Sequence, residues 1–188
     1  LDRQMTRPVI LHVAESIGAG VGTFLRLLTS EAALGSKFEH VIFCGKREMP
    51  EDVQSSFRNA SIGIWEHSSR QIAPVKDILA FLELRRFITS LKPDILHLHS
   101  AKAGLLGRVA ARTLGFQDRT LYTPHGVAFA NPAQRRSVTL AYREFEKLGA
   151  RFGGEIVACS PSEAHVLARA GIRSTTIENG IPVLSAAP

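Results

Sequence analysis

The sequence predicts an α/β protein built on a doubly wound, mostly parallel sheet of about seven strands with helices on both faces. Short runs rich in valine and isoleucine alternate with longer segments of helical period along the whole chain. Several of these runs, including residues 9–13 and 156–158, are apolar on both faces, which is typical of parallel strands covered by helices. Such sheets are Rossmann-like, and 188 residues are enough for one domain of this kind with its own core.

The individual elements follow from residue patterns. Helices are expected where apolar residues recur at helical spacing, as Leu84, Ile88 and Leu91 do. Right-handed crossovers then connect the parallel strands. The expected strands are Val9–Ala14, His40–Cys44, Ser61–Trp65, Asp94–Leu98, Thr120–Thr123, Glu155–Cys159 and Thr175–Ile177. The expected helices are Val21–Leu34, Glu51–Arg58, Val75–Leu91, Ala103–Leu114, Ala133–Arg151 and Ser162–Ala170.

Composition and charge exclude several classes of protein. The hydrophobic fraction of 45% and the charged fraction of 21% fit a globular chain and exclude a disordered or collagen-like one. No run approaches the ~18 uninterrupted apolar residues of a membrane-spanning helix, and the first residues lack the apolar segment of a secretory signal. The formal net charge of +6 suits phosphorylated small molecules or an anionic membrane. We expect no nucleic-acid partner, because the basic residues are scattered and few aromatic rings are available for stacking.

The two cysteines indicate a reducing compartment. Cys44 and Cys159 each end an apolar run and lack the spacing of metal ligands. We expect both to be reduced, half-buried side chains. The expected location is therefore the cytoplasm.

Polar residues follow most of the expected strands. Doubly wound parallel sheets bind their ligands beyond the carboxyl ends of the strands. Glycine, hydroxyl, imidazole and amide groups therefore converge on one edge of the sheet, which predicts a site for a polar small molecule. The segments that follow the strands are Gly18–Gly22, Gly45–Arg47, His99–Lys102, Pro124–Gly126, Ser160–Ser162 and Asn179–Gly180.

The glycine-rich turn at Gly18–Gly22 leads from the first strand into a helix. Such a turn lets backbone N–H groups approach a phosphate at the positive end of the helix. It is not the dinucleotide fingerprint, because Thr23 stands where the third glycine would be, and it lacks the lysine of a P-loop. A flexible turn that binds nothing is the alternative.

Two histidines end the fourth expected strand. Alternation places His97 and His99 on the same side, with His99 nearer the edge of the sheet. We interpret His97 as a core residue, and we expect His99 to face the cleft while Ser100 caps the next helix. Metal binding by this pair is disfavoured, because no carboxylate or cysteine lies nearby in the sequence to complete a ligand set.

A third histidine stands where the fifth strand must leave the sheet. Pro124 ends the strand, and Gly126 permits an unusual backbone angle after His125. A histidine held there can donate to a phosphate or carbonyl oxygen, or act as an acid or base near neutral pH. The alternative is an ordinary turn residue.

The expected helix at residues 133–151 is basic and amphipathic. Its five basic residues outnumber Glu144 and Glu146, and Val138, Leu140 and Phe145 contribute to an apolar side. A helix of this kind can lie on anionic lipid headgroups. A solvated helix face is the alternative. The basic residues are Arg135, Arg136, Arg143, Lys147 and Arg151.

Four segments resemble a known family when they are taken together. They are PDILHLHSAKAG at residues 93–104 with Gly107 and Arg108, YTPHG at 122–126 with Phe129, IVACSPSE at 156–163, and IENGI at 177–181. In this order they resemble the N-terminal domain of the family 4 retaining glycosyltransferases, which have the GT-B fold. The similarity runs over nearly the whole chain.

The resemblance implies transfer of a sugar, with retention at the anomeric carbon, from a nucleotide-sugar to a glycan or lipid-linked acceptor. It implies that this domain shapes the acceptor site, with His125 as the catalytic histidine and the glycine-rich turn near the donor diphosphate. Neither a covalently bound cofactor nor a metal is expected, since the family needs no divalent ion and the chain has no Asp-x-Asp pair. The implied substrate-binding residues are Ala19, Gly20, Val21, Gly22, His99, Ser100, Lys102, Gly126, Ser160 and Asn179.

The chain departs from the family pattern in the glycine-rich turn and in its length. Ala19 replaces the first of two paired glycines, and Gly22 stands where an acidic residue is common. We expect residues 8–181 to form one Rossmann-like GT-B N-terminal domain, residues 1–7 to be a disordered or cloning-derived terminus, and residues 182–188 to begin an interdomain linker. The partner that completes the enzyme would be a C-terminal donor-binding domain absent from this chain, which we expect to be inactive alone.

Three hypotheses remain after the sequence is read. The first is the acceptor domain of a cytoplasmic glycosyltransferase in cell-surface or exopolysaccharide synthesis, with peripheral contact to the inner face of the anionic cell membrane. The second is an NADP-binding oxidoreductase domain in which Lys46 and Arg47 meet the 2′-phosphate. The third is a non-catalytic subunit of a split glycosyltransferase.

Overall fold

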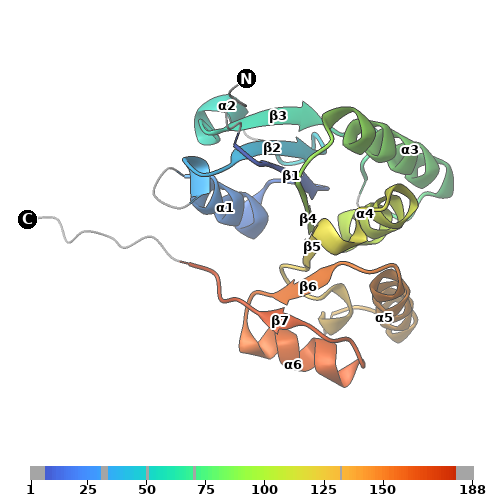
Figure 1. Ribbon diagram of the computed structural model, residues 1–188. Helices are drawn as coiled ribbons and strands as arrows, with labels where there is room; N and C mark the ends of the chain where they lie inside the picture. The colour runs from blue at the N-terminus through green and yellow to red at the C-terminus, as the bar shows by residue number, and fades with distance from the viewer. Residues whose placement is uncertain (1–6, 31–33, 50, 70, 132, 181–188) are drawn as a thin grey trace, which may run out of the picture.

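The computed structural model describes residues 7–30, 34–49, 51–69, 71–131 and 133–180. Its centre is one sheet of seven strands in the order β3-β2-β1-β4-β5-β6-β7, with every neighbouring pair parallel (Figure 1). This confirms the predicted α/β, Rossmann-like sheet. The strands are β1 Val9–Ala14, β2 Glu39–Cys44, β3 Ala60–Ile64, β4 Ile95–His99, β5 Thr120–Thr123, β6 Glu155–Ala158 and β7 Thr175–Thr176.

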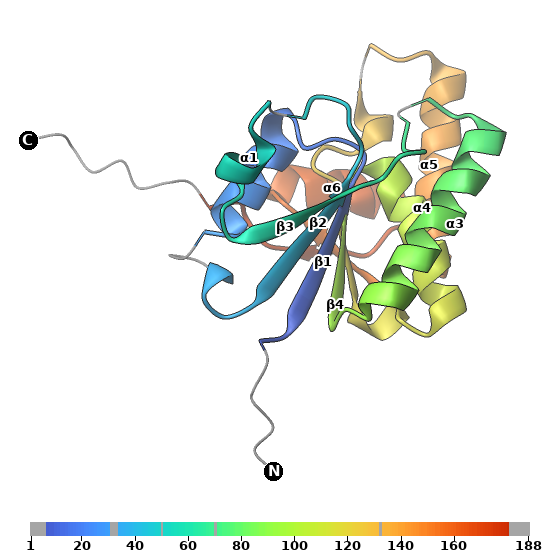
Figure 2. The same cartoon turned by 90° about the horizontal axis from the view of Figure 1, so that it is seen from above.

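Helices cover both faces of the sheet. Helices α3, α4 and α5 lie side by side against one face, and α1 and α2 cover the other (Figures 1 and 2). Strand order reverses between β1 and β4, which is where ligands bind in doubly wound sheets. The helices are α1 Ala19–Leu28, α2 Val53–Ser56, α3 Pro74–Leu91, α4 Ala101–Leu114, α5 Arg136–Arg151 and α6 Pro161–Arg169, with short 3₁₀ turns η2 Gln117–Arg119 and η3 Ala128–Ala130.

The predicted boundaries were wrong mainly in the helices. Helix α1 ends at Leu28, with Thr29 as its C-cap, and not at Leu34; residues 31–33 of the predicted helix lie outside the described residues. The helix predicted at residues 51–58 is a single turn. Helix α5 begins three residues later than predicted, at Arg136.

Two apolar clusters lie on opposite faces of the sheet, because strand residues alternate between faces. Leu11 and Val13 of β1 pack with buried residues of α3 and α4, among them Leu84. Ala14 faces the other way and packs with Leu25 of α1. The strands are therefore apolar on both sides at most positions, as the sequence predicted.

Two glycines of α4 allow the helix to approach the sheet closely. A Cβ atom on Gly104 would lie 2.3 Å from the ring of Tyr122, and one on Gly107 would lie 2.3 Å from Leu98. The glycines that carry the family resemblance in this segment therefore serve packing. They place the start of α4 directly against the ends of β4 and β5.

A buried ion pair joins α4, β5 and α5. Arg108 donates to Glu146 at 3.0 Å, and the hydroxyl of Tyr122 donates to the other carboxylate oxygen at 2.6 Å. The guanidinium of Arg108 also lies 4.3 Å above the Tyr122 ring. Because removing one partner would leave a buried charge unpaired, this group holds α5 in place beside the cleft.

Both ends of the domain predicted for residues 8–181 lie at the limits of the described chain. The N-terminal segment predicted at 1–7 is described only at Arg7, which donates to the carbonyl of Gly35 at 3.1 Å. The linker predicted at 182–188, and Ile181 of the fourth motif, lie outside the described residues. Within the described ranges, no helix combines the length and apolar character needed to cross a membrane.

We predict that Gly104→Ala lowers the free energy of unfolding by about 1–3 kcal/mol, because the added methyl group meets the buried ring of Tyr122. Gly20→Ala is the matched control, since a Cβ atom there meets nothing within 4 Å and alanine favours the helix. Urea unfolding followed by circular dichroism measures both. Equal stability of Gly104→Ala and the parent chain would contradict the packing role.

Candidate functional site

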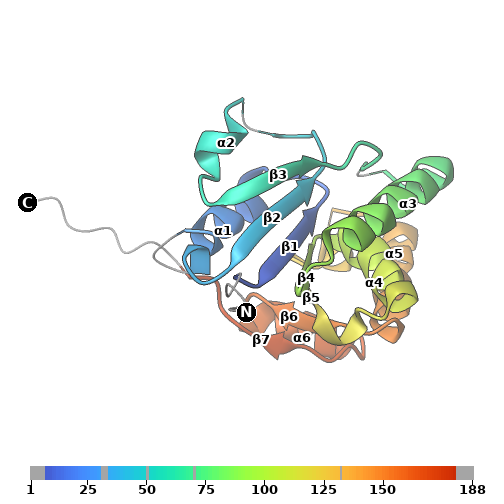
Figure 3. The same cartoon turned by 45° about the horizontal axis from the view of Figure 1, so that its top comes forward.

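Two cavities open at the edge of the sheet where the parallel strands end, the edge to which the arrowheads of β1, β2 and β3 point (Figure 3). Their volumes are about 750 and 540 Å³. Glu15, Val21 and Ser100 line both, so the cavities adjoin at the reversal of strand order. The predicted edge of the sheet is therefore hollowed.

The larger cavity, which we call the His125 cavity, has an apolar wall and a polar end. Leu105, Leu106 and Phe145 contribute to the wall, which α4 and α5 provide. The polar and charged side chains in its lining are Glu15, Asp77, Ser100, Lys102, His125, Asn131, Gln134, Tyr142 and Glu146.

Glu15 organises the junction of β1 and α4. Its Oε1 atom accepts hydrogen bonds from the backbone N–H groups of Lys102 at 2.6 Å and Ala103 at 3.2 Å, and from the hydroxyl of Ser100 at 3.1 Å. Burial raises the pKa of this carboxyl, and these hydrogen bonds oppose the shift. The prediction that Ser100 caps α4 was wrong, because Glu15 occupies the helix end and Ser100 donates to it.

Ser100 stands in a strained conformation at the same point. Its φ of 73° and ψ of 163° belong to a region that glycine adopts almost alone. Such an outlier costs on the order of 1–3 kcal/mol, which the surrounding contacts must offset. The hydrogen bond to Glu15 holds Ser100 at the meeting point of the two cavities.

Lys102 lines the His125 cavity, as predicted, but its charge is already paired. Its Nζ atom donates to Asp77 at 2.6 Å and Ser69 at 3.1 Å, and also to the carbonyl of Gln71. The side chain is 11% exposed. Lys102 therefore anchors the start of α3 to the start of α4.

The glycine-rich turn adopts the geometry of a helix start. Ala19 has a φ of 46°, a left-handed value that favours glycine, where the family pattern has glycine. A Cβ atom on Gly22 would lie 1.9 Å from the carbonyl oxygen of Ile17, so this glycine is required by close approach. Of the predicted turn residues, Val21 lines both cavities, whereas Ala19, Gly20 and Gly22 line neither.

Carboxylates surround the basic residues that follow β2. Lys46 pairs with Glu66 at 2.9 Å, and Arg47 pairs with Glu48 at 2.7 Å. The Glu48 carboxylate also accepts from Ser16 at 2.9 Å, beside the glycine-rich turn. In the NADP hypothesis both cations would have to exchange a carboxylate partner for the 2′-phosphate.

His125 and Gly126 form a strained turn that lines the His125 cavity. Their φ angles are 53° and 101°. Glu163 holds this turn: one carboxylate oxygen accepts from the N–H of Gly126 at 2.7 Å and the other from the N–H of Cys159 at 2.7 Å. The serine-to-glutamate stretch at residues 160–163 thus supports His125 from α6, with Ser160 accepting from the N–H of Glu163 as the cap of that helix.

His99 lies behind His125 and not in the cleft. It is fully buried, and its Nδ1 atom is 2.9 Å from Nε2 of His125. The expectation that His99 faces the cleft was therefore wrong, because the turn at His125 covers it. His97 is buried and hydrogen-bonded to Thr123 at 3.0 Å, which confirms its interpretation as a core residue.

Burial keeps these imidazoles neutral. It lowers the pKa of His97 to about 3 and that of His125 to about 4, where Glu163 acts in the opposite direction. Burial and neighbouring histidines also lower the pKa of His12 and His99 well below the usual value. His125 therefore serves near neutral pH as a neutral donor or acceptor, which corrects the expectation that it titrates there.

The sequence argument against a metal site considered only His97 and His99. The structure brings a third histidine, His12, beside them. One ring nitrogen from each of His12, His97 and His99 lies within 4.8 Å of the others, and all three rings are buried. Strand β1 brings His12 to this place, so distance in the sequence was a poor guide. Both nitrogens of His12 and of His99 already make hydrogen bonds to other histidines.

Two of the remaining predicted residues, Ser160 and Asn179, lie outside the two cavities. Ser160 caps α6, and Asn179 is exposed beyond β7. Gly126 lines the His125 cavity. Cys44 and Cys159 are both free thiols, as expected, but only Cys159 is half-buried, because Cys44 is completely buried in the sheet.

Sequence reasoning missed three groups that shape the site: Glu15, Glu163 and His12. Glu163 was visible inside the quoted IVACSPSE segment, where its spacing from Ser160 is that of a helix cap. Glu15 and His12 carried no local signal. Their partners are 85 or more residues away in the chain, at Ser100, Lys102 and His99.

Known proteins are similar in sequence to most of this chain. A profile described as Glycosyltransferase Family 4 matches residues 18–183. An Escherichia coli protein, UDP-Gal:alpha-D-GlcNAc-diphosphoundecaprenol alpha-1,3-galactosyltransferase, is 30% identical over 123 residues, covering 63% of this chain and 31% of that protein. A Klebsiella pneumoniae protein described as an uncharacterized 41.2 kDa protein in the cps region is 26% identical over 172 residues, covering 90% of this chain and 45% of that protein.

A solved structure shares the fold. Sucrose-phosphate synthase from Thermosynechococcus elongatus superimposes with a TM-score of 0.67 at 16% sequence identity, covering 92% of this chain and 47% of that one. At this identity the likeness concerns the fold alone. The matched segments span less than half the length of each of these relatives.

We predict that the free energy of unfolding falls as the pH is lowered from 7 toward 5. A histidine whose folded pKa is depressed contributes stability above its unfolded pKa of about 6.5, and that contribution is lost as the pH falls toward the folded value. Each such histidine adds about 1.4 kcal/mol per pH unit to the slope. Urea unfolding at several pH values measures it.

His97→Gln should reduce this slope by about the contribution of one histidine. His165→Gln, on the exposed side of α6, is the control and should leave the slope near that of the parent chain. A stability that is flat between pH 7 and 5 would contradict the neutral state of the buried rings.

Proposed function

Because this chain belongs to glycosyltransferase family 4, we propose that the complete protein transfers a sugar, with retention, from a nucleotide-sugar to a lipid-linked acceptor in polysaccharide synthesis. The name of the E. coli relative specifies a UDP-sugar donor and a diphosphoundecaprenol-linked acceptor, and the K. pneumoniae relative is named for its cps region. Family membership favours this reading over the NADP-binding alternative.

The observation that carries the proposal is the composition of the His125 cavity. A cavity of about 750 Å³ that combines an apolar wall with one polar end suits an acceptor with a sugar head and a lipid tail. The polar end contains His125, Ser100 and the paired Lys102 and Asp77. The apolar wall runs along α4 and α5, and the lipid would leave the cavity on that side.

In this proposal His125 positions the reacting sugars as a neutral group. With Nε2 engaged by His99, only its Nδ1 atom remains for a ligand in the cavity. Its strained turn is held by Glu163, so the ring is fixed before a substrate binds. A preorganised hydrogen-bonding group is effective in catalysis because it needs no rearrangement during the reaction.

The glycine-rich turn would receive the donor diphosphate. Helix α1 begins there with Gly18 as its cap and no acidic residue in its first turn. The positive end of a helix stabilises the charge that accumulates on a leaving diphosphate. In this proposal the nucleotide is held mainly by a second domain outside this chain, and residues 1–188 alone have no turnover.

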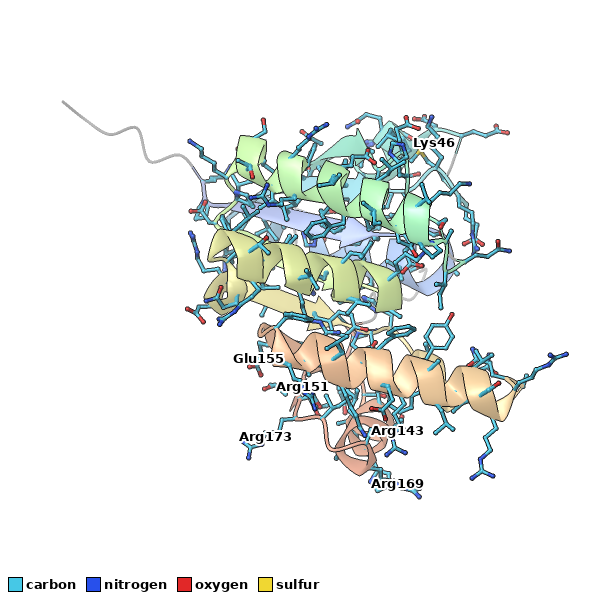
Figure 4. The ribbon with its side chains drawn as sticks, turned by 90° about the vertical axis from the view of Figure 1, so that its right-hand side faces the viewer. Lys46, Arg143, Arg151, Glu155, Arg169 and Arg173 are labelled. Carbon is cyan, nitrogen blue, oxygen red and sulfur yellow. The ribbon has the colours of Figure 1, made fainter. Side chains whose placement is uncertain are left out.

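We further propose that the protein is cytoplasmic and that α5 and α6 rest on the anionic inner face of the membrane. Leu140 and Leu148 of α5 are 48% and 42% exposed. Figure 4 shows arginines of α5, of α6 and of the segment after α6 gathered in one region, with Glu155 among them and Lys46 at the far end of the molecule. These arginines are Arg143, Arg151, Arg169 and Arg173. Exposed leucines beside a basic cluster favour binding to anionic lipid headgroups.

We predict that His125→Ala lowers kcat of the complete protein by about 100-fold or more, because the positioned hydrogen-bonding group is lost. The assay measures transfer of labelled sugar from a panel of UDP-sugars into organic-extractable undecaprenyl-diphosphate-linked acceptor. His165→Ala, on the exposed side of α6, is the control and should retain full activity. The proposal fails if no UDP-sugar is transferred, or if both variants behave alike.

We predict that the chain floats with vesicles containing phosphatidylglycerol and not with neutral phosphatidylcholine vesicles. Arg151→Glu combined with Arg169→Glu should abolish flotation, because it reverses the basic cluster. Lys46→Glu combined with Arg58→Glu changes the net charge equally on a distant surface and should leave flotation intact. Equal flotation with both kinds of vesicle would refute the membrane contact.

A further inference from the structure

Four histidine rings form a continuous hydrogen-bonded line beneath α1. Nε2 of His125 lies 2.9 Å from Nδ1 of His99. Nε2 of His99 lies 3.2 Å from Nδ1 of His12, and Nε2 of His12 lies 3.0 Å from Nδ1 of His40. Every link therefore joins Nε2 of one ring to Nδ1 of the next, and we call these four residues the histidine line.

The histidine line crosses four adjacent elements of the sheet. His40 is the second residue of β2, His12 lies in the middle of β1, His99 ends β4, and His125 follows β5. It therefore runs from the His125 cavity to the opposite end of β2. His12, His40 and His99 are at most 1% exposed. Phe24 of α1 packs against His99 and His125 and closes the line from above.

A neutral imidazole has one nitrogen that carries a proton and one that does not. Burial lowers the pKa of all four rings, so neutral rings are the state near neutral pH. Each N–H···N link then needs a protonated nitrogen on one side and a bare nitrogen on the other. Because all links pair Nε2 with Nδ1, the four rings must carry their protons on the same nitrogen.

This arrangement couples the tautomer of His125 to the tautomer of His40, three links away. If one ring changed its tautomer alone, one neighbouring link would hold two protons and another would hold none. The line therefore has two consistent forms, with all four protons on Nε2 or all four on Nδ1. The two forms carry the same number of protons and differ at the ends of the line, at Nδ1 of His125 and at the buried Nε2 of His40.

We propose that His99, His12 and His40 are positioning residues that set which nitrogen of His125 carries the proton. They thereby decide whether Nδ1 of His125 accepts or donates a hydrogen bond in the cavity. The coupling of tautomers is a property of these residues alone. Its effect on a hydrogen bond to the hydroxyl or phosphate of a sugar substrate rests on the proposed function.

The first test needs no variant. In the chain labelled with ¹⁵N-histidine, two-bond ¹H–¹⁵N correlation spectra at pH 7 report which nitrogen of each ring is protonated. We expect the same tautomer in His12, His40, His99 and His125, with through-hydrogen-bond nitrogen coupling across the links. A mixture of tautomers along the line would overturn the proposal, whether or not the protein is a glycosyltransferase.

The second test breaks the line at its far end. His40→Phe keeps a ring of similar size and should shift the ratio of His125 tautomers by about twofold or more, because the network is cooperative. His97→Phe is the matched control: His97 is buried on the same face, 4.1 Å from His99 between ring centroids, but it bonds Thr123 and not the line. It should leave the ratio unchanged.

Three further results would overturn the proposal. A folded His40→Phe variant with an unchanged His125 ratio would mean that the far end of the line does not act on His125. A His97→Phe variant with an equal change would mean that packing alone acts on His125. A stoichiometric shift of the His12, His97 and His99 signals on adding zinc would mean that these rings form a metal site. If His40→Phe does not fold, the tautomer pattern of the parent chain still decides.

Discussion

The carboxylate of Glu15 joins the end of β1 to the start of α4 at the point where strand order reverses. It follows β1, and it binds the first N–H groups of α4, which belongs to the other half. An acidic group at the positive end of a helix is electrostatically favourable, and here it also fixes Ser100 in a conformation that serine rarely adopts. Glu15 and Ser100 both line the two cavities, so these hydrogen bonds contribute to the shape of the site.

The same region shows how the fold accommodates polar groups in its interior. The face of the sheet beneath α1 contains a line of histidines. Burying these polar rings costs free energy of desolvation that aliphatic residues at the same places would not cost. Their cost is limited because they hydrogen-bond to one another, and burial keeps them neutral. On the opposite face, Arg108 and Glu146 offset each other beside Tyr122. The histidines thus connect β2, β1 and β4 to the turn at His125, and the ion pair with Tyr122 connects α4, α5 and β5.

The fold and the edge that bears the site were predictable, because both depend on local patterns. Valine- and isoleucine-rich runs marked the strands, and the polar residues after them marked the hollowed edge, including His125 and Ser100. The side-chain roles were harder to predict. His99 was expected to follow its strand and face the cleft, but it is the last residue of β4 and the turn at His125 covers it. Lys102 was expected to be available for a substrate, but Asp77, from another helix, neutralises it.

The sequence by itself determined the parallel α/β sheet, the family and the edge of the sheet that carries the two cavities, because periodicity and short motifs are properties of neighbouring residues. Only the tertiary structure decided which side chains act together. Glu15 hydrogen-bonds to the start of α4, Glu163 hydrogen-bonds to the turn at His125, and four histidines from separate elements form one line. These hydrogen bonds depend on distances in space, which cannot be read directly from the order of the residues.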